Sequence, residues 1–347
     1  MNPSFRKYNL LLPLGWLYGL ATALRNRMYD SGMLESTSFP IPVISIGNIT
    51  AGGTGKTPHT EYLVALLKDN IHTAVLSRGY GRSTPGFILA DDTSTSQTIG
   101  DEPLQIKRRF PDIEVAVCED RVSGIKTLLR TRRPRVVVLD DAFQHRKVKP
   151  SLNILLVNYN RFILDDAMLP AGRLRESAKG RSRAHMIIVT KCPADLPQDA
   201  MDNMTKRLAV SPKQTVFFTS LEYGDIYPMD GKSPVPAADC PVLAVTGIAD
   251  PAPMEAQLRK SHNEVQMLSF PDHHVFSKRN IREIETRLAN MTQGTAIITT
   301  AKDAARLQDA CIGESLREKI FILPVKPKFL NDSQAFDSII LNHVQLS

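Results

Sequence analysis

The sequence predicts an α/β protein of the P-loop NTPase type, in which helices flank a parallel sheet. It also predicts a second, smaller α/β domain and an N-terminal amphipathic helix. First, a glycine-rich segment ending in GTGKT follows a short apolar strand at residues 42–46 and precedes a helical stretch at 58–68. Second, apolar strands alternate with helical segments, which is typical of a parallel sheet. Further strands of the first unit are expected at 73–77, 113–117, 135–139, 153–157 and 186–190. Third, a similar series with strands at 242–246, 264–269, 296–300 and 321–325 predicts the second unit.

Length and composition fit this organisation. A chain of 347 residues suggests two or three domains. Its 42% hydrophobic and 23% charged residues exclude a disordered, collagenous or multi-span membrane protein. The net charge of +7 favours an anionic partner, which leaves a nucleotide, a nucleic acid or an anionic membrane. The four cysteines are far apart and form no CxxC pair, which argues against a disulfide framework and indicates a reducing compartment.

Residues 8–24 form an uncharged, leucine-rich stretch between basic residues. A signal peptide would leave two arginines just after its cleavage site, and a spanning helix needs about 20 apolar residues without the breaks seen here. Two interpretations stay open. On a helix, Gly15, Gly19 and Thr22 share one narrow face, so the apolar remainder either docks on a membrane surface or packs against the protein.

The glycine-rich loop is the clearest chemical signal. Its glycines let backbone N–H groups surround phosphate oxygens, while Lys56 adds charge near the β- and γ-phosphates. Thr57 can bind Mg²⁺ through its hydroxyl group. The strict pattern has glycine where this chain has Thr50, so the match is a variant. The residues expected to bind the nucleotide are Thr50, Ala51, Gly52, Gly53, Thr54, Gly55, Lys56 and Thr57.

An apolar strand that ends in Asp140 and Asp141 supplies the second part of the site. Beside the glycine-rich loop, either carboxylate can hold Mg²⁺ directly or through water. The two motifs together predict a nucleoside triphosphate and Mg²⁺. They leave the phosphate acceptor undefined.

Further motifs narrow the function. They stand in the order GNITAGGTGKTP (47–58), SRGYGR (77–82), GDEP (100–103), DDAFQH (140–145), LPAGRLRE (169–176), FPDHHVF (270–276) and TTAKDAARL (299–307). This ordered set resembles the tetraacyldisaccharide 4′-kinase family, the lipid A 4′-kinases of Gram-negative envelopes. Two departures stand out: the family usually has glycine where this chain has Ala142, and proline where it has Arg173. Both lie beside functional residues, yet we expect the activity to persist.

The resemblance implies transfer of phosphate from ATP to the 4′-hydroxyl of a tetraacylated glucosamine disaccharide 1-phosphate. It also implies an Asp–His pair, with Asp101 as the base that orients or accepts the hydroxyl proton. His273 is the expected partner, and His274 is the second choice. We count Lys56 and Asp141 with Asp101 and His273 as catalytic residues. Closure of the second domain would assemble the pair.

The remaining site residues are assigned to metal and acceptor. Thr57, Asp140 and Glu176 are the expected Mg²⁺ ligands, although Asp141 could take the place of Asp140 or tune Lys56. Arginine can hold the 1-phosphate of the acceptor in a bidentate manner. The residues expected to contact the acceptor are Asn48, Arg78, Tyr80, Arg82, Arg121, Gln144, His145 and Arg173.

The expected organisation has five parts: a membrane-docking helix (1–30), a P-loop kinase core (31–168), an interdomain linker (169–178), a second α/β domain (179–325) and a C-terminal segment that returns to the core (326–347). The resemblance implies a monotopic protein on the cytoplasmic face of the inner membrane. We expect a monomer whose partners are the lipid and the membrane surface, with no nucleic acid.

Three rival functions compete with this interpretation. A membrane-associated ATPase of the partitioning type has a lysine where this chain has Ala51, so it is the alternative rather than the first choice. A nucleic-acid-dependent NTPase lacks support, because no recognisable binding motif is present. A GTPase would need an acidic residue to read guanine where this chain has Pro193. ATP is therefore the expected nucleotide.

Overall fold

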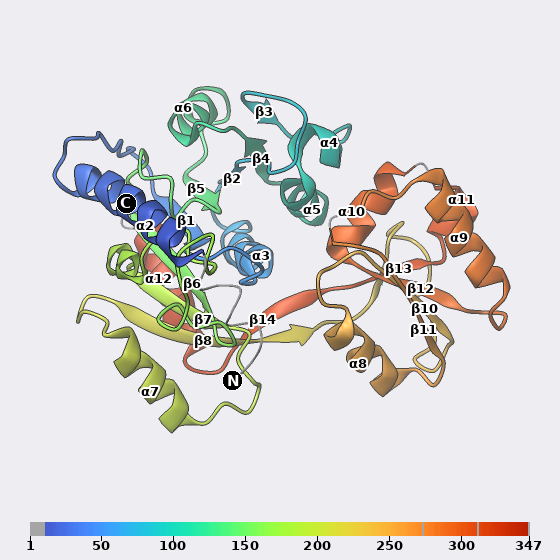
Figure 1. Ribbon diagram of the computed structural model, residues 1–347. Helices are drawn as coiled ribbons and strands as arrows, with labels where there is room; N and C mark the ends of the chain where they lie inside the picture. The colour runs from blue at the N-terminus through green and yellow to red at the C-terminus, as the bar shows by residue number, and fades with distance from the viewer. Residues whose placement is uncertain (1–10, 273, 311, 346–347) are drawn as a thin grey trace.

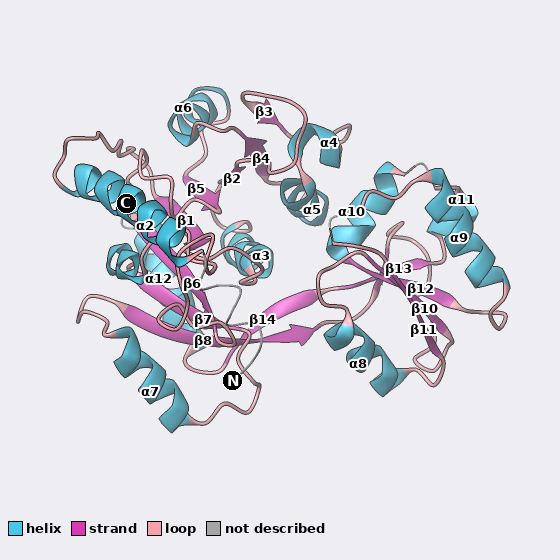
Figure 2. Cartoon of the chain, in the orientation of Figure 1, coloured by secondary structure: helices cyan, strands magenta, loops and turns pink. Residues whose placement is uncertain are grey.

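A computed structural model of the chain describes residues 11–272, 274–310 and 312–345. Two α/β units lie side by side, each built around its own sheet (Figure 1). The larger sheet has nine strands and the smaller has five. Figure 2 shows strands in the interior of both units and helices on their outer faces. This arrangement confirms the predicted fold class of a parallel sheet covered by helices.

The larger sheet has the strand order β14-β8-β7-β6-β1-β5-β2-β4-β3. Its central strands pair in parallel, and only β3–β4 and β8–β14 are antiparallel. Every residue of β1, β2, β5, β6 and β7 is buried, as expected for a sheet covered on both faces. The strands are β1 (Val43–Asn48), β2 (Thr73–Ser77), β3 (Ile88–Leu89), β4 (Glu114–Val117), β5 (Val136–Asp140), β6 (Leu152–Asn158), β7 (Met186–Thr190), β8 (Thr215–Tyr223) and β14 (Val325–Phe329).

Helices cover both faces of this sheet because alternate strand residues face opposite sides. Ile44 packs in one apolar cluster together with Leu63 of α3 and Phe336 of α12, whereas Val43 packs in another with Ile125 of α6. The helical segments of this unit are α3 (Lys56–Leu67), α4 (Ser96–Ile99), α5 (Asp101–Arg109), α6 (Arg121–Thr131), the 3₁₀ helix η1 (Ala178–Arg183), α7 (Gln198–Leu208) and α12 (Ser333–Gln345).

The smaller sheet has the order β11-β10-β12-β13-β9, parallel except for β9. Its strands are β9 (Tyr227–Pro228), β10 (Val242–Thr246), β11 (Val265–Ser269), β12 (Ala296–Thr300) and β13 (Ile320–Leu323). Its helices are α8 (Ala252–Ser261), α9 (Lys278–Ala289), α10 (Ala301–Asp309) and α11 (Glu314–Arg317).

The boundary between the units differs from the predicted one. Residues 179–223, assigned by sequence to the second domain, contribute β7 and β8 to the larger sheet. The chain leaves this sheet after Tyr223 and returns at Val325, and these two residues pair across the antiparallel strands β8 and β14. The sequence analysis missed β8 because its burial is mixed and its outer residues are exposed.

The predicted interdomain linker, residues 169–178, lies against the glycine-rich loop and does not connect the two units. Leu174 forms a β-bridge with Thr50 of the glycine-rich loop, and the Arg175 N–H donates to Ile49 O at 2.8 Å. The Ala51 N–H donates to Arg173 O at 2.7 Å. The LPAGRLRE segment is therefore a wall of the phosphate-binding loop rather than a hinge.

The N-terminal helix α2 (Leu12–Asp30) packs through its small residues. A Cβ at Gly15 would lie 3.1 Å from Met168 O, and one at Gly19 would lie 3.3 Å from the Met168 side chain. The opposite face is apolar and exposed: Trp16 is 73% exposed and Leu20 is 68% exposed. The packed face agrees with the interpretation that the helix packs against the protein, and docking of the exposed face on a membrane stays a prediction. Within the described part of the chain, every helix is too short or too polar to cross a bilayer.

Candidate active site

The glycine-rich loop lies at the carboxyl edge of the larger sheet, between β1 and α3. Gly52 and Gly55 have φ angles of 104° and 79°, which residues with a Cβ rarely adopt. The loop is held from inside, because the Asn48 amide donates to Thr54 Oγ1 and the Thr190 hydroxyl donates to Thr54 O, each at 2.8 Å. A loop of this shape before the first turn of α3 is suited to binding an anion through its N–H groups.

Asp140 ends β5 beside this loop, because it pairs in register with Ile46 of β1. It is only 1% exposed. Its carboxylate accepts hydrogen bonds from the Thr60 hydroxyl at 3.0 Å and from the Ser77 hydroxyl at 3.5 Å. Two neutral hydroxyl groups are modest compensation for a buried charge.

The surroundings of Asp140 fit a divalent cation. Burial raises its pKa to about 7, with further contributions from the negative charges of Glu102 and Asp141. A cation would offset this cost, and carboxylate and hydroxyl oxygens from Asp140 and Thr57 are the ligands that Mg²⁺ prefers. The described residues contain no group of three His, Cys, Asp or Glu side chains able to hold a metal. This sparse set suits Mg²⁺, which keeps water and phosphate oxygens in its shell.

Asp141 contacts the loop lysine directly. Its carboxylate lies 3.6 Å from Lys56 Nζ and 3.4 Å from an Arg175 guanidinium nitrogen. The backbone of Asp141 has a φ angle of 47°, a conformation uncommon outside glycine. Of the two roles left open for Asp141, this geometry favours the positioning of Lys56, and Asp140 is the more buried of the two carboxylates.

Glu176 is 3% exposed and occupies a different place from the one predicted. Its two oxygens accept hydrogen bonds from Arg183, Asn26 and Gln144 at 2.8–3.1 Å. It therefore joins α2 to the loop after β5. A role as metal ligand stays a prediction, because these donors would have to release the carboxylate.

Asp101 begins α5 in a tightly packed turn. The preceding residue, Gly100, has a φ angle of 90°, and a Cβ there would lie 2.9 Å from Tyr80 O. The SRGYGR and GDEP motifs are thus packed together. Glu102 is close enough to Asp140 to raise its pKa, which places the start of α5 beside the candidate metal site. From the smaller unit, Arg306 donates two hydrogen bonds to the Asp101 carboxylate.

The two histidine candidates differ in what the structure describes of them. His273 lies outside the described residues. His274 stacks on Phe270 with ring centroids 4.6 Å apart and makes a 3.1 Å hydrogen bond with the Asn280 side chain, contacts that suit a structural role. The FPDHHVF loop adjoins α10, because Asp272 forms a 3.5 Å ion pair with Lys302. The same helix carries the arginine that reaches Asp101.

The predicted arginines have unequal surroundings. Arg78 and Tyr80 are exposed, and the backbone of Tyr80 lies beside Gly100. Arg82 instead folds back, pairing with Glu119 and donating to Gly86 O at 2.7 Å. It holds the loop and does not present its charge to solvent.

Arg121 is 3% exposed, and its Nε finds no hydrogen-bond partner among the described residues. Burial lowers the pKa of Arg121, the negative charge of Asp140 raises it, and the positive charge of Arg78 lowers it further. A buried guanidinium group with an unpaired donor near the metal site is suited to an anionic ligand.

Gln144 and His145 lie on the loop after β5, at the base of α2. The Gln144 amide donates to Asn48 O at 2.6 Å, which joins two residues predicted to contact the acceptor. Burial lowers the pKa of His145 to about 4, helped by Arg121, so its ring is neutral near pH 7. Arg173 is exposed at the outer side of the phosphate loop. The departure at Ala142 is buried and packs in the core.

Sequence reasoning missed two cations at the rim of the loop. A Cβ at Gly53 would lie 3.7 Å from Lys191 Nζ, and one at Gly52 would lie 3.5 Å from an Arg161 nitrogen. Burial lowers the pKa of Lys191, with an opposing effect of Asp250 from the smaller unit. Lys191 directly follows β7. Its position at the carboxyl end of a buried strand is the sequence feature that could have indicated its place near the phosphate loop.

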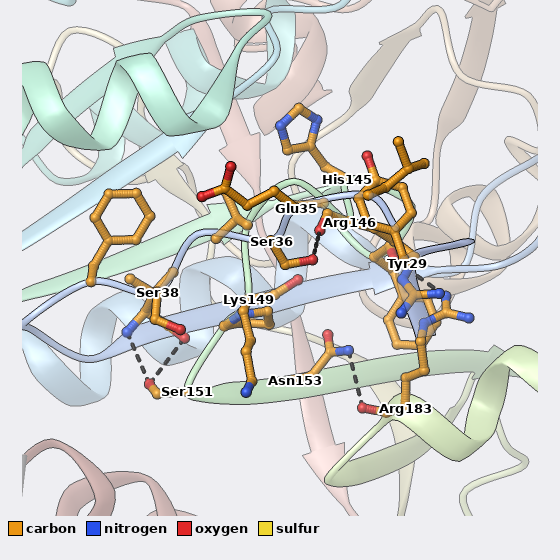
Figure 3. Close-up of a pocket in the computed structure, with 18 of the residues that line it drawn as sticks. Tyr29, Glu35, Ser36, Ser38, His145, Arg146, Lys149, Ser151, Asn153 and Arg183 are labelled. Carbon is orange, nitrogen blue, oxygen red and sulfur yellow. Dashed lines mark hydrogen bonds between the residues drawn. The ribbon is translucent and has the colours of Figure 1, made fainter. Parts of the chain in front are cut away.

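A cavity of about 830 Å³ lies apart from the phosphate loop, under the segment that follows α2 (Figure 3). Of the predicted site residues, only His145 lines it. Ser45 Oγ, Asn153 Oδ1 and His145 Nε2 line this cavity and lack hydrogen-bond partners among the described residues. Figure 3 shows Asn153 bonded to Arg183 on the sheet side of the cavity. Nothing in the sequence analysis anticipated it.

Comparisons with known proteins agree on one family. The family model described as LpxK, tetraacyldisaccharide-1-P 4′-kinase, matches residues 8–345. Tetraacyldisaccharide 4′-kinase from Bacteroides thetaiotaomicron is 45% identical, covering 99% of this chain and 96% of the relative. The protein of the same name from Flavobacterium johnsoniae is 44% identical, covering 97% of each. A crystal structure of LpxK from Aquifex aeolicus in complex with ATP superposes with a TM-score of 0.76 at 30% identity, covering 97% of this chain and 99% of that one.

Proposed function

The chain belongs to the tetraacyldisaccharide-1-P 4′-kinase family, and from this premise we propose how its residues perform the reaction. The activity is ATP-dependent phosphorylation of the 4′-hydroxyl of a tetraacylated glucosamine disaccharide 1-phosphate, a step of lipid A biosynthesis. One observation carries the assignment of roles. The phosphate loop and buried Asp140 share one sheet edge, and the start of α5 brings Asp101 to that edge.

The nucleotide end of the site uses the loop at 50–57. Its N–H groups bind phosphate oxygens, and Lys56, held by Asp141, supplies a cation at the transferred group. Lys191 and Arg161 extend the positive rim beyond Gly52 and Gly53. The match with an ATP-bound structure supports ATP as the nucleotide.

Asp140 and Thr57 hold Mg²⁺ in this proposal. When bound, Mg²⁺ neutralises charge on the phosphate oxygens. Asp140 is suited to this place because it is buried and, among the described residues, its carboxylate accepts hydrogen bonds from two neutral hydroxyl groups. Asp141 keeps Lys56 oriented alongside.

Asp101 acts on the acceptor. Its carboxylate orients the 4′-hydroxyl and takes the proton as the new O–P bond forms and the bond from the γ-phosphorus to the bridging oxygen of ADP breaks. Transfer of a phosphoryl group needs a well-aimed acceptor more than a strong base. We assign His273 as the partner of Asp101 on the basis of the family pattern.

The acceptor lies between α2 and the two arginine-bearing loops. Arg78 and Arg121 offer guanidinium donors for its 1-phosphate, and Arg121 has a buried donor without a partner among the described residues. Gln144, His145 and Asn48 form the wall nearest the phosphate loop. Tyr80 is 79% exposed beside Asp101's turn and supplies an aromatic face for a sugar.

The exposed face of α2 docks on the cytoplasmic surface of the inner membrane. Trp16, Leu17, Leu20 and Leu24 are each at least 60% exposed. Leucine and tryptophan on one face and arginines at the helix end suit the headgroup layer. Docking this face would bring a membrane lipid to the site beside the other end of the helix.

Transfer of labelled γ-phosphate from ATP to tetraacyl disaccharide 1-phosphate in detergent micelles tests the function. We expect label in the lipid, and its loss in Lys56→Ala. Lys213→Ala, which changes an exposed lysine of the same unit, should retain transfer. Label released only as free phosphate, with the lipid unchanged, would contradict the proposal and favour an ATPase.

A further inference from the structure

Helices α5 and α10 form the contact between the two units at the active site (Figure 1). Arg306 of α10 reaches across this contact to Asp101 at the start of α5. Its Nε and Nη2 donate to Asp101 Oδ2 at 3.0 Å and 2.5 Å. The Arg306 side chain is 3% exposed, whereas that of Asp101 is 22% exposed. The ion pair is therefore largely removed from solvent on the side of the smaller unit.

The smaller unit holds Arg306 in place. Arg306 Nη1 donates to Asp303 Oδ1 at 3.1 Å and to Gly247 O at 3.2 Å. Asp303 is itself 0% exposed. Its other oxygen accepts hydrogen bonds from the Thr246 hydroxyl, the Gly247 N–H and the Thr300 hydroxyl at 2.8–3.2 Å. A fully bonded carboxylate thus fixes the guanidinium plane that meets Asp101.

A second ion pair joins the same two helices away from Asp101. Arg108 of α5 lies 2.9 Å from Asp309 of α10 and also donates to Ala305 O. Its side chain is 29% exposed. Asp309 in turn accepts a 2.8 Å hydrogen bond from the Ser96 N–H. The Arg108–Asp309 ion pair therefore holds the two units together independently of Asp101.

We propose that Arg306 is a positioning residue that aims the Asp101 carboxylate at the acceptor hydroxyl, so that the smaller unit completes the site through this contact. The proposal rests on the proposed role of Asp101 as the base. Both hydrogen bonds fall on one oxygen and fix the orientation of the carboxylate. Burial among fixed partners gives Arg306 the rigidity that such a role requires.

Steady-state kinetics of the full chain with ATP and the lipid in micelles provides the test. Misplacing a catalytic group by about 1 Å can cost about 100-fold in rate. We therefore expect Arg306→Gln to lower kcat about 10- to 100-fold, with the KM values for ATP and lipid within about threefold of wild type. The matched variant Arg108→Gln, which removes the other ion pair, should change kcat by less than about threefold.

Two further variants separate positioning from attachment. Arg306→Lys keeps the charge but loses the bidentate geometry, so its kcat should lie between those of wild type and Arg306→Gln. In an Asp101→Asn background, Arg306→Gln should cost little more, because the carboxylate that it aims is already gone. If Arg306→Gln does not fold, Arg306→Lys compared with Arg108→Lys gives the same decision.

Equal losses in the Arg306 and Arg108 variants would overturn the proposal, as would a full further loss from Arg306→Gln in the Asp101→Asn background. Either result would make Arg306 an attachment residue only. Asp101→Asn with wild-type turnover would remove the premise of the proposal while leaving lipid phosphorylation intact. Absence of label in the lipid with the wild-type chain would instead overturn the proposed function, so the two failures are distinguishable.

Discussion

The nucleotide end and the acceptor end of the site are built in different ways. The nucleotide end is contained in one sheet edge, where β1, β5 and the loop before α3 place Lys56, Thr57 and Asp140 together. The acceptor end depends on partners from distant parts of the chain. Asp101 is held by Arg306 from the smaller unit, and Gln144 is held beside Glu176 and α2.

This difference teaches where control of the reaction can lie. A site inside one sheet edge is rigid whenever the larger unit is folded. A site made of contacts between units is complete only when those contacts form. We therefore expect changes to Asp140 or to the phosphate loop itself to affect binding and chemistry together. Changes at the cationic rim should affect nucleotide binding, and changes at the base end should affect chemistry alone.

The largest effect is expected at Asp140. Asp140→Asn removes the candidate metal carboxylate, so turnover should fall by about 10³-fold or more. Stability should change in the opposite direction. Folding raises the pKa of this carboxyl group from 3.8 to about 7, so its ionised form destabilises the fold, and stability is lost as pH rises through that interval. The metal-free variant should therefore melt a few degrees higher at pH 7.5. Thermal unfolding in EDTA checks this, and a lower Tm would contradict it.

The next effect concerns the Asp–His pair. Asp101→Ala and His273→Ala should each lower kcat by about 10²- to 10⁴-fold, because a positioned acid–base group contributes this much. The double variant should cost much less than the product of the two, since the residues act as a unit.

His274→Ala is the control for this pair. The His274 side chain bonds Asn280 and stacks on Phe270, so its loss should lower stability more than kcat. Multiplicative losses for Asp101 and His273, or an equal kcat loss for His274→Ala, would refute a pair formed with His273.

A smaller effect is expected at the rim of the phosphate loop. Lys191→Met removes a cation next to Gly53 and should raise the KM for ATP by about ten- to 100-fold, as expected for one charge-assisted phosphate contact. The kcat should change little. Lys213→Met serves as the control for loss of an exposed lysine. A Lys191 variant with unchanged ATP affinity would exclude it from the nucleotide site.

The smallest effect on chemistry is expected at α2. Leu17→Glu with Leu20→Glu places two charges on its exposed apolar face and should abolish sedimentation with anionic vesicles. ATP affinity should stay within about twofold, because the face lies away from the packed glycines. Val235→Glu alters an apolar residue of the smaller unit that is 55% exposed and should leave vesicle binding intact. Binding that survives the α2 change would contradict docking by this face.

The same contrast explains what the sequence could reveal. The phosphate loop and Asp140 were predictable, because each follows a buried strand in a parallel sheet and such strand ends meet at one edge. The strands β2, β7, β10 and β12 were placed at their observed bounds for the same reason, since each is mainly apolar and is buried throughout or nearly so.

Contacts between distant segments were not predictable. Arg306 is one of many basic residues, and only tertiary structure shows that Asp303 aims it at Asp101. The predicted domain boundary was wrong because the chain leaves the larger sheet at the end of β8 and returns to it at the start of β14, and these two strands pair in an antiparallel manner. Glu176 was predicted as a metal ligand, and the sequence did not reveal its hydrogen bonds to Asn26 of α2 and to Arg183. Each case turns on a partner far away in the sequence.

The central claim is that the two ends of the site do separate work, and Asp101→Asn tests it most directly. ATP affinity and single-turnover transfer of γ-phosphate to the lipid would be measured on the same preparation. The account predicts an ATP Kd within about twofold of wild type and a transfer rate at least about 100-fold lower. Unchanged transfer, or loss of ATP binding in parallel with transfer, would contradict it.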